Sequence, residues 1–256
     1  MIDPRAIIDP SAQIHETVTI GPYSIIGANV QIGAQTWIGP HVVIKGPTRI
    51  GERNKIYQFA SIGDIPQDKK YDGEDTLLEI GIENVIREYT TINRGTVQGG
   101  GVTRIGDNNW IMAYVHIAHD CIVGNHTTFA NNASLAGHVT IEDYATLGGY
   151  VLVAQFCNIG AYSFCSIASV VHKDVPPYVL VAGHMAKPVS INLIGLRRAN
   201  FSEETIRNLR NAYKLLYRYG LRFEDSIKEL KKIAEINPDV QVFLSFLERS
   251  NRGIIR

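Results

Sequence analysis

The chain has 256 residues, 45% of them hydrophobic and 20% charged, and its formal net charge is zero. This is globular composition, and the balanced charge gives no support to nucleic-acid binding. The sequence has three cysteines without a CxxC spacing, no apolar run long enough to span a membrane and no signal-peptide pattern, so we expect a cytoplasmic protein without a transmembrane segment.

Isoleucine occurs at every sixth position from Ile2 to Ile62. The spacing returns at Ile80 to Ile92 and then, one residue out of phase, continues from Ile105 to Val171. A helix needs apolar residues every three to four positions and a strand alternates by two, so a period of six fits neither. It fits a coil of short strands, each with one inward aliphatic residue, whose turns stack at about 4.8 Å. The sequence therefore predicts a mainly β protein, a parallel β-helix over residues 1–190.

Two polar segments interrupt this repeat. They are "GDIPQDKKYDGEDT" and its flank at 63–79, and the glycine-rich "NRGTVQGGGVTR" at 93–104. Insertions in a solenoid frequently lie on its binding face, although a solvated excursion is an equally good interpretation of either segment alone.

The repeat is expected to close near Pro176 and Pro177, and a small α-helical domain is predicted over residues 191–256. Ser202 is a candidate N-cap for one helix, and Asn237 with Pro238 begins another. Residues 196–256 carry 13 Lys and Arg against 8 Asp and Glu, whereas residues 1–195 carry 12 against 17. A basic tail of this kind suits an acidic partner.

The repeat resembles the left-handed β-helix of the hexapeptide acyltransferases, in which three blocks of six make one coil. The left-handed crossover, an exception among parallel strands, is implied by this resemblance. Residues 18 apart would then stack, so that His119 lies against Gly137 and Gln155, and Asp120 against His138. His119 and Asp120 follow the inward Ile117 at a corner, and we expect them to project outside the prism.

Three interpretations of this cluster remain open. Converging imidazoles could hold zinc, as in the γ-class carbonic anhydrases, which would make the protein a zinc-dependent hydratase. An exposed histidine can also be a solvated residue on a non-enzymatic scaffold. A histidine beside a carboxylate is, however, the usual arrangement of a general base.

Several longer motifs favour the general base. They are "IYQFASIG" (56–63), "RGTVQGGG" (94–101), "HIAHDC" (116–121), "ANNASLAGHV" (130–139), "DVPPYV" (174–179), "RNAYKLLYR" (210–218) and "SNRGIIR" (250–256). Over the whole chain the sequence resembles the UDP-N-acetylglucosamine O-acyltransferases that begin lipid A biosynthesis. The N-acyltransferases that act later in that pathway tend to have Asn where Asp120 stands.

The resemblance implies transfer of an (R)-3-hydroxyacyl chain from acyl carrier protein to the 3-hydroxyl of UDP-N-acetylglucosamine. No cofactor and no metal are expected, because the phosphopantetheine arm arrives with the carrier. The assembly implied is a homotrimer with sites between subunits. His119 would be the base, Asp120 its support and Gly137 the oxyanion donor. The resemblance assigns substrate binding to Gln67, Asp68, Lys70, His116, His138, Gln155, Asn192 and Arg198, and the acyl-length ruler to Ile167 and Met185.

Some positions depart from the family pattern. Ala154, Ile194 and Ala199 stand where His, Glu and Arg are usual on the nucleotide side, and Asn93 stands where His is usual. These changes leave the nucleotide contacts open, and with them the choice between the 3-hydroxyl and the 3-amino analogue of UDP-N-acetylglucosamine. Bulk at Ile167 is expected to favour acyl chains of about ten to twelve carbons over fourteen.

Overall fold

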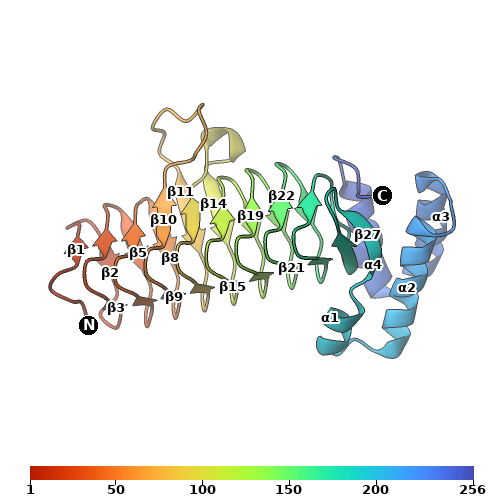
Figure 1. Cartoon of the computed structure of the whole chain (residues 1–256), viewed down its shortest axis with the longest axis horizontal. Helices are drawn as coiled ribbons and strands as arrows, with labels where there is room; N and C mark the ends of the chain where they lie inside the picture. Colours follow the sequence, from red (N-terminus) through yellow and green to blue (C-terminus); the bar gives the residue numbers. More distant parts are fainter.

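The computed structural model describes residues 1–256, and it is a long prism with a group of helices at one end (Figure 1). Three sheets form its sides. The nine-stranded sheet contains β1 (Ile7–Ile8), β4 (Ile25–Ile26), β7 (Val43–Ile44), β10 (Ser61–Asp64), β13 (Thr91–Asn93), β16 (His116–Ile117), β19 (Ser134–Leu135), β22 (Leu152–Val153) and β25 (Val170–Val171).

The other two sheets have the same stacked order. The eight-stranded sheet contains β2 (Gln13–Ile14), β5 (Val30–Ile32), β8 (Thr48–Ile50), β11 (Leu77–Ile80), β14 (Val102–Ile105), β17 (Ile122–Val123), β20 (Thr140–Ile141) and β23 (Asn158–Ile159). The ten-stranded sheet contains β3 (Thr19–Ile20), β6 (Trp37–Ile38), β9 (Lys55–Ile56), β12 (Val85–Ile86), β15 (Trp110–Ile111), β18 (Thr128–Phe129), β21 (Thr146–Leu147), β24 (Phe164–Cys165), β26 (Val179–Ala182) and β27 (Lys187–Ile191).

The register confirms that the period of six places one aliphatic residue inward per strand. Ile8 pairs with Ile26, and Ile117 with Leu135, each 18 residues on. From Ile20 onward the paired residues are buried and form one core cluster that continues into the helices, whereas Ile8 and Ile14 of the first coil are partly buried. Ile80 pairs with Ile105, 25 residues on, because the second insertion adds seven residues to that coil. Seven is not a multiple of six, and this accounts for the change of phase in the sequence.

Most corners of the prism are turned by a non-glycine residue with positive φ. This conformation costs roughly 1–2 kcal/mol for an L-residue. Ring stacking between successive coils offsets part of that cost. Along one corner, rings stack with centroids 4.8–5.4 Å apart from Tyr23 through His41, Phe59 and Tyr89 to Tyr114. Another corner stacks His138 on Phe156.

The two insertions leave the prism side by side (Figure 1). The Arg94 N–H donates to the Asp64 carbonyl, and the Leu77 N–H to the Gly101 carbonyl. The Arg94 guanidinium donates to the Tyr71 hydroxyl of the first insertion and to the Gly46 carbonyl of the prism. The second insertion contains the short 3₁₀ helix η1 (Val97–Gly99). Both insertions are thus tied to the prism and to each other.

Strand pairing continues beyond Pro176 and Pro177, because β26 pairs in parallel with β24 before β27 turns back against it. Four helices follow: α1 (Leu193–Arg198), α2 (Glu203–Tyr217), α3 (Phe223–Ala234) and α4 (Pro238–Arg249). The Ser202 side chain caps α2, and Asn237 stands before α4 with Pro238 at its start, as the sequence predicts. The chain end returns to the prism, where the Ile255 N–H donates to the Asp174 carbonyl. None of the helices has the length and apolarity that crossing a bilayer requires.

Candidate active site

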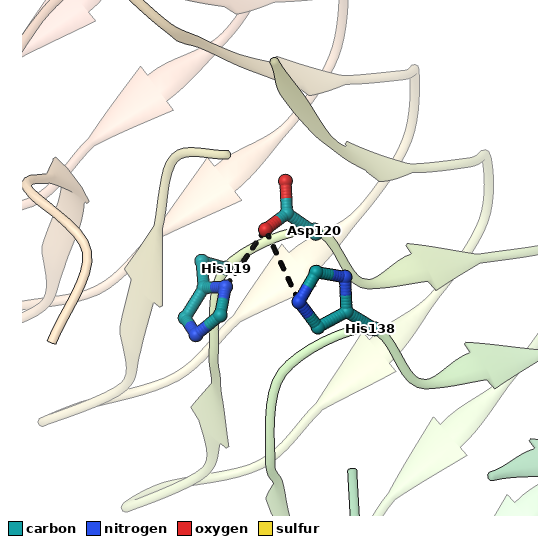
Figure 2. A group of neighbouring side chains, drawn as sticks. All are labelled: His119, Asp120 and His138. Carbon is teal, nitrogen blue, oxygen red and sulfur yellow. Dashed lines mark hydrogen bonds and ion pairs between the residues drawn. The ribbon is translucent and has the colours of Figure 1, made fainter. Parts of the chain in front are cut away.

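Three side chains meet at the corner between β16 and β17 and on the next coil (Figure 2). His119 Nδ1 lies 2.7 Å from Asp120 Oδ2, and His138 Nε2 lies 3.8 Å from the same oxygen. An ionised carboxylate only accepts hydrogen bonds, so His119 Nδ1 carries the proton. With the proton on Nδ1, Nε2 is the nitrogen of this ring that can accept a proton from another molecule.

His119 and Asp120 are buried, with 6% and 5% of their surface exposed. The expectation that they project outward is therefore wrong in part: they lie outside the core but are covered. Asp120 is covered by the second insertion, because Thr96 donates through both its N–H and its hydroxyl to the Asp120 carboxylate. A strand repeat with corner residues does not indicate that an insertion will fold over them.

The stacking predicted from the 18-residue coil is confirmed. The His138 N–H donates to the His119 carbonyl on the coil below. A methyl group placed on Gly137 would lie 2.5 Å from Cε1 and 2.7 Å from Nε2 of His119, so the ring packs directly on this glycine. The Gly137 N–H has no protein acceptor. A free N–H donor therefore lies beside the free imidazole nitrogen.

Two adjoining cavities, of about 390 and 470 Å³, share Gln67, His119 and Gln155 in their walls. The first is lined in addition by His116, Gly137 and strand residues that include Leu152, and the second by Asp68, Lys69, Lys70, His138 and Phe156. One chain thus brings together eight of the predicted residues: Gln67, Asp68, Lys70, His116, His119, Gly137, His138 and Gln155. A larger groove lies elsewhere, along the eight-stranded sheet, but it is shallow and its charged groups Arg49, Glu79 and Arg104 pair with one another.

Burial keeps the two neighbouring imidazoles neutral. The pKa of His116 is lowered by burial and by the nearby His119. The pKa of His138 is lowered chiefly by burial, against the opposing effect of the Asp120 charge. His116 Nδ1 also lies 2.7 Å from the Thr91 hydroxyl, which fixes its ring. Both rings can therefore make hydrogen bonds to a ligand without adding positive charge to the cavity.

Asn192 and Arg198 do not join this cluster within one chain. The Asn192 amide donates to the Tyr162 carbonyl, at the corner between the eight- and ten-stranded sheets. His138 turns the corner between the nine- and eight-stranded sheets, and Arg198 ends α1 beyond Asn192.

The two predicted ruler residues lie further along the prism. Ile167 is at the turn between β24 and β25, and its surface is 70% exposed. Met185, in the β26–β27 turn, is also exposed, and its neighbour Ala186 bonds to Val170 of the same region. Leu152, which lines the first cavity, is on β22 beside β25. Leu152 pairs with Val170, three residues after Ile167, so this side chain of the cavity wall and the predicted ruler lie on neighbouring coils.

Ligand atoms of His119, Asp120 and His138 lie within 4.8 Å of one another, close enough to hold a metal ion. The Asp120 oxygens, however, already accept bonds from Thr96 N–H, the Thr96 hydroxyl and His119 Nδ1. A metal would have to replace these donors. The arrangement is instead that of a base whose ring is oriented by a carboxylate.

The sequence did not single out Thr96 or Thr103, which both contact Asp120. Thr96 belongs to an insertion that shifts the repeat, so no fixed spacing relates it to residue 120. The motif "RGTVQGGG" was the available signal, but it pointed to a loop and not to a contact.

Comparison with known proteins assigns the family. Residues 174–255 match the family model described as UDP N-acetylglucosamine O-acyltransferase, domain 2. Residues 29–64 and 102–137 match the bacterial transferase hexapeptide, six repeats.

Relatives cover the whole chain. The acyl-[acyl-carrier-protein]–UDP-N-acetylglucosamine O-acyltransferase of Alkalilimnicola ehrlichii is 58% identical over 255 residues, covering 100% of this chain and 99% of that protein. The protein of the same name from Neisseria gonorrhoeae is 56% identical with the same coverage.

Solved structures agree with the left-handed β-helix expected from the sequence. The UDP-N-acetylglucosamine acyltransferase of Francisella novicida superposes with a TM-score of 0.98 at 42% identity, covering 100% of this chain and 94% of that one. The UDP-N-acetylglucosamine O-acyltransferase of Moraxella catarrhalis gives 0.97 at 48% identity, covering 100% and 99%. The chain therefore belongs to the UDP-N-acetylglucosamine O-acyltransferase family of hexapeptide-repeat acyltransferases.

Proposed function

We propose that this chain transfers an (R)-3-hydroxyacyl group from acyl carrier protein to the 3-hydroxyl of UDP-N-acetylglucosamine. One observation carries the proposal: an imidazole oriented by a carboxylate packs on Gly137, whose N–H has no protein acceptor, and His119 lies in the walls of two adjoining cavities with polar side chains. Relatives of more than half identity have names that describe acyl transfer from acyl carrier protein to an oxygen of UDP-N-acetylglucosamine. Those names describe acyltransferases, so they do not favour zinc-dependent hydration.

The reaction is a general-base acyl transfer. The sugar hydroxyl attacks the thioester carbon while His119 Nε2 takes its proton, and the Asp120 carboxylate stabilises the imidazolium that forms. The Gly137 N–H donates to the carbonyl oxygen as it gains negative charge. When the intermediate collapses, the carbon–sulfur bond breaks and the leaving thiolate receives the proton from His119. General-base assistance of this kind contributes roughly 10²- to 10⁴-fold to the rate.

The cavity residues would hold the sugar nucleotide. Asp68 and Lys70 come from the first insertion and offer an acceptor and a cation to hydroxyl and phosphate groups. His116 and His138, both neutral, would bond to the sugar or to the pantetheine arm. Gln155 would contact the nucleotide from the coil above Gly137.

We propose a homotrimer in which Asn192 and Arg198 of one subunit complete the site of the next. Support comes from their position at another corner of the prism, where they cannot serve the His119 cavity of their own chain. The planar guanidinium of Arg198 suits a diphosphate, which it can bind bidentately.

The acyl carrier protein would dock on the basic helical domain. Arg210, Lys214 and Arg222 form no salt bridge within the chain, whereas Arg197 pairs with Glu203 and Arg218 bonds to a carbonyl. Three buried free cysteines agree with the reducing cytoplasm, where we place the enzyme.

Ile167 and Met185 would limit the acyl chain. Leu152, Ile167 and Met185 are apolar and exposed in one chain, which suits residues that would contact an acyl tail. Each methylene that Ile167 excludes is worth about 0.8 kcal/mol. Competition among 3-hydroxyacyl carriers should therefore favour about ten to twelve carbons, and a clear preference for fourteen would contradict this role.

One experiment tests the reaction itself. The protein is incubated with acyl carriers and either UDP-N-acetylglucosamine or its 3-amino analogue, and the products are identified by mass. We expect an ester with the natural sugar, and mild alkali should release the acyl chain from it. Acylation of the amino analogue alone, or of neither acceptor, would overturn the proposal.

A further inference from the structure

The carboxylate of Asp120 is held from several sides. Oδ1 accepts the Thr96 N–H at 2.7 Å, and Oδ2 accepts the Thr96 hydroxyl at 2.6 Å. Oδ2 also accepts His119 Nδ1–H at 2.7 Å. The Asp120 backbone is fixed in turn, because its N–H donates to the Thr103 hydroxyl at 2.8 Å.

Thr96 is the only residue that donates to both oxygens of this carboxylate. Two donors on one residue define the plane of the carboxylate, since a rotation about the Cβ–Cγ bond of Asp120 would break both contacts. The plane decides where Oδ2 lies, and Oδ2 decides which nitrogen of His119 keeps its proton. Thr96 therefore acts on the imidazole without touching it.

The backbone of the second insertion packs closely against Asp120. A methyl group on Gly99 would overlap the Asp120 carboxylate, so the turn of η1 closes directly on it. The Thr96 hydroxyl also accepts the Gly99 N–H at 3.2 Å, while its own proton goes to Asp120 Oδ2. Thr96 itself is 1% exposed, so no solvent molecule replaces its hydroxyl in this arrangement.

We propose that Thr96 is a positioning residue for the reaction. Through Thr96 the second insertion holds Asp120, and Asp120 fixes His119 with Nδ1 protonated and Nε2 free toward the cavity. This deepens the proposed acyl transfer and rests on it for its kinetic consequence. The orientation of His119 can be measured independently of any activity.

The kinetic test compares Thr96→Val with Thr96→Ser. Valine keeps the shape and removes the hydroxyl, and we expect kcat to fall about 10- to 100-fold, the effect of losing a hydrogen bond to a charged group. KM for UDP-N-acetylglucosamine should change less than about threefold. Serine restores the donor and should return kcat to within about threefold of the unchanged protein.

Thr127→Val is the matched control. Thr127 is equally buried at 1%, and it likewise donates its N–H and its hydroxyl to one side-chain oxygen, that of Asn109, at 2.8 and 2.6 Å. Its loss should lower stability and leave kcat unchanged. A Thr96→Val enzyme with unchanged kcat, or an equal loss of kcat in Thr127→Val, would overturn the proposal.

The second readout is the nitrogen-15 and proton NMR signal of the His119 ring, assigned by its loss in His119→Gln. A sheltered Nδ1–H resonance is expected in the unchanged protein, Thr96→Ser and Thr127→Val, and its broadening by solvent exchange in Thr96→Val. An unaltered resonance in Thr96→Val refutes the positioning role. If the unchanged protein acylates neither acceptor, the proposed function fails, while this signal still decides what Thr96 does.

Discussion

The His119 imidazole has one partner on each side: Asp120 on Nδ1, and the bare backbone of Gly137 on the next coil beside Nε2. Replacing His119 by Ala removes the proposed base and leaves the N–H of Gly137 in place. We expect kcat, measured with saturating acyl carrier and UDP-N-acetylglucosamine, to fall by roughly 10²- to 10⁴-fold. KM, measured by varying the concentration of each substrate, should change less. Activity above a tenth of the original would exclude His119 as the base.

The lowered pKa values of His116 and His138 predict how stability depends on pH. The folded protein binds fewer protons than the unfolded chain once the pH falls below the ordinary histidine value of 6.5. Above that pH the two histidines therefore do not lower the free energy of unfolding. The free energy of unfolding decreases as the pH falls from there toward the lower folded-state pKa values. Melting temperatures measured on either side of this window should show the decline.

A variant isolates the histidine contribution from that of the carboxylates. His116→Gln removes one buried titrating group, so its melting temperature should fall less steeply with acidification than that of the unchanged protein. His15→Gln, at an exposed position of the first coils, serves as the control and should leave the slope as it is. Equal slopes in all three proteins would contradict the assignment to His116.

At the scale of the element, a buried ladder of side chains joins successive coils. The Asn84 amide donates to Asn54 Oδ1 at 3.0 Å and to the Gly106 carbonyl at 2.9 Å, and its oxygen accepts the Asn109 N–H. Asn84 is fully buried, so in Asn84→Ala these groups would lose their hydrogen-bond partner where water cannot replace it. We expect a loss of about 1–3 kcal/mol in the free energy of unfolding, measured by urea denaturation.

The exposed Asn251 offers the comparison for this ladder. Asn251→Ala should change the free energy of unfolding by no more than about 0.5 kcal/mol. If the two variants were equally stable, the ladder would not contribute to the stacking of coils.

At the scale of the whole molecule, the shared site of the proposed trimer can be tested by complementation. His119→Ala and Arg198→Ala are each expected to lower activity, because each removes one half of every site. When the two variants are co-expressed and assemble at random, about a quarter of the sites should contain both original residues. The recovered activity, measured at limiting UDP-N-acetylglucosamine, should clearly exceed the sum of the two variants alone.

A second pair of variants controls for assembly. His119→Ala and Asp120→Asn alter the same half of the site, so co-expression of these two should recover nothing. If the two pairs recovered the same activity, or if the protein had a monomeric mass in solution, the proposal that subunits share the site would be wrong.

The period of six was sufficient to predict the β-helix, because one inward residue per block leaves a period that neither a helix nor an ordinary strand has. It also determined that His119 stacks on Gly137 and Asp120 beside His138, since residues one coil apart must lie in register. The N-cap Ser202 and the helix start at Asn237 and Pro238 were equally local, as they depend on a few neighbouring residues.

What covers Asp120 follows from the tertiary structure alone. Thr96 lies 24 residues before Asp120, in an insertion whose path follows from contacts such as Arg94 with Tyr71 and Gly46 and not from the repeat. The same holds for Asn192, whose distance from the His119 corner depends on how the last coil turns into α1. A periodic sequence fixes neighbours one coil apart, whereas insertions and the chain's end are placed by non-local packing that has no period.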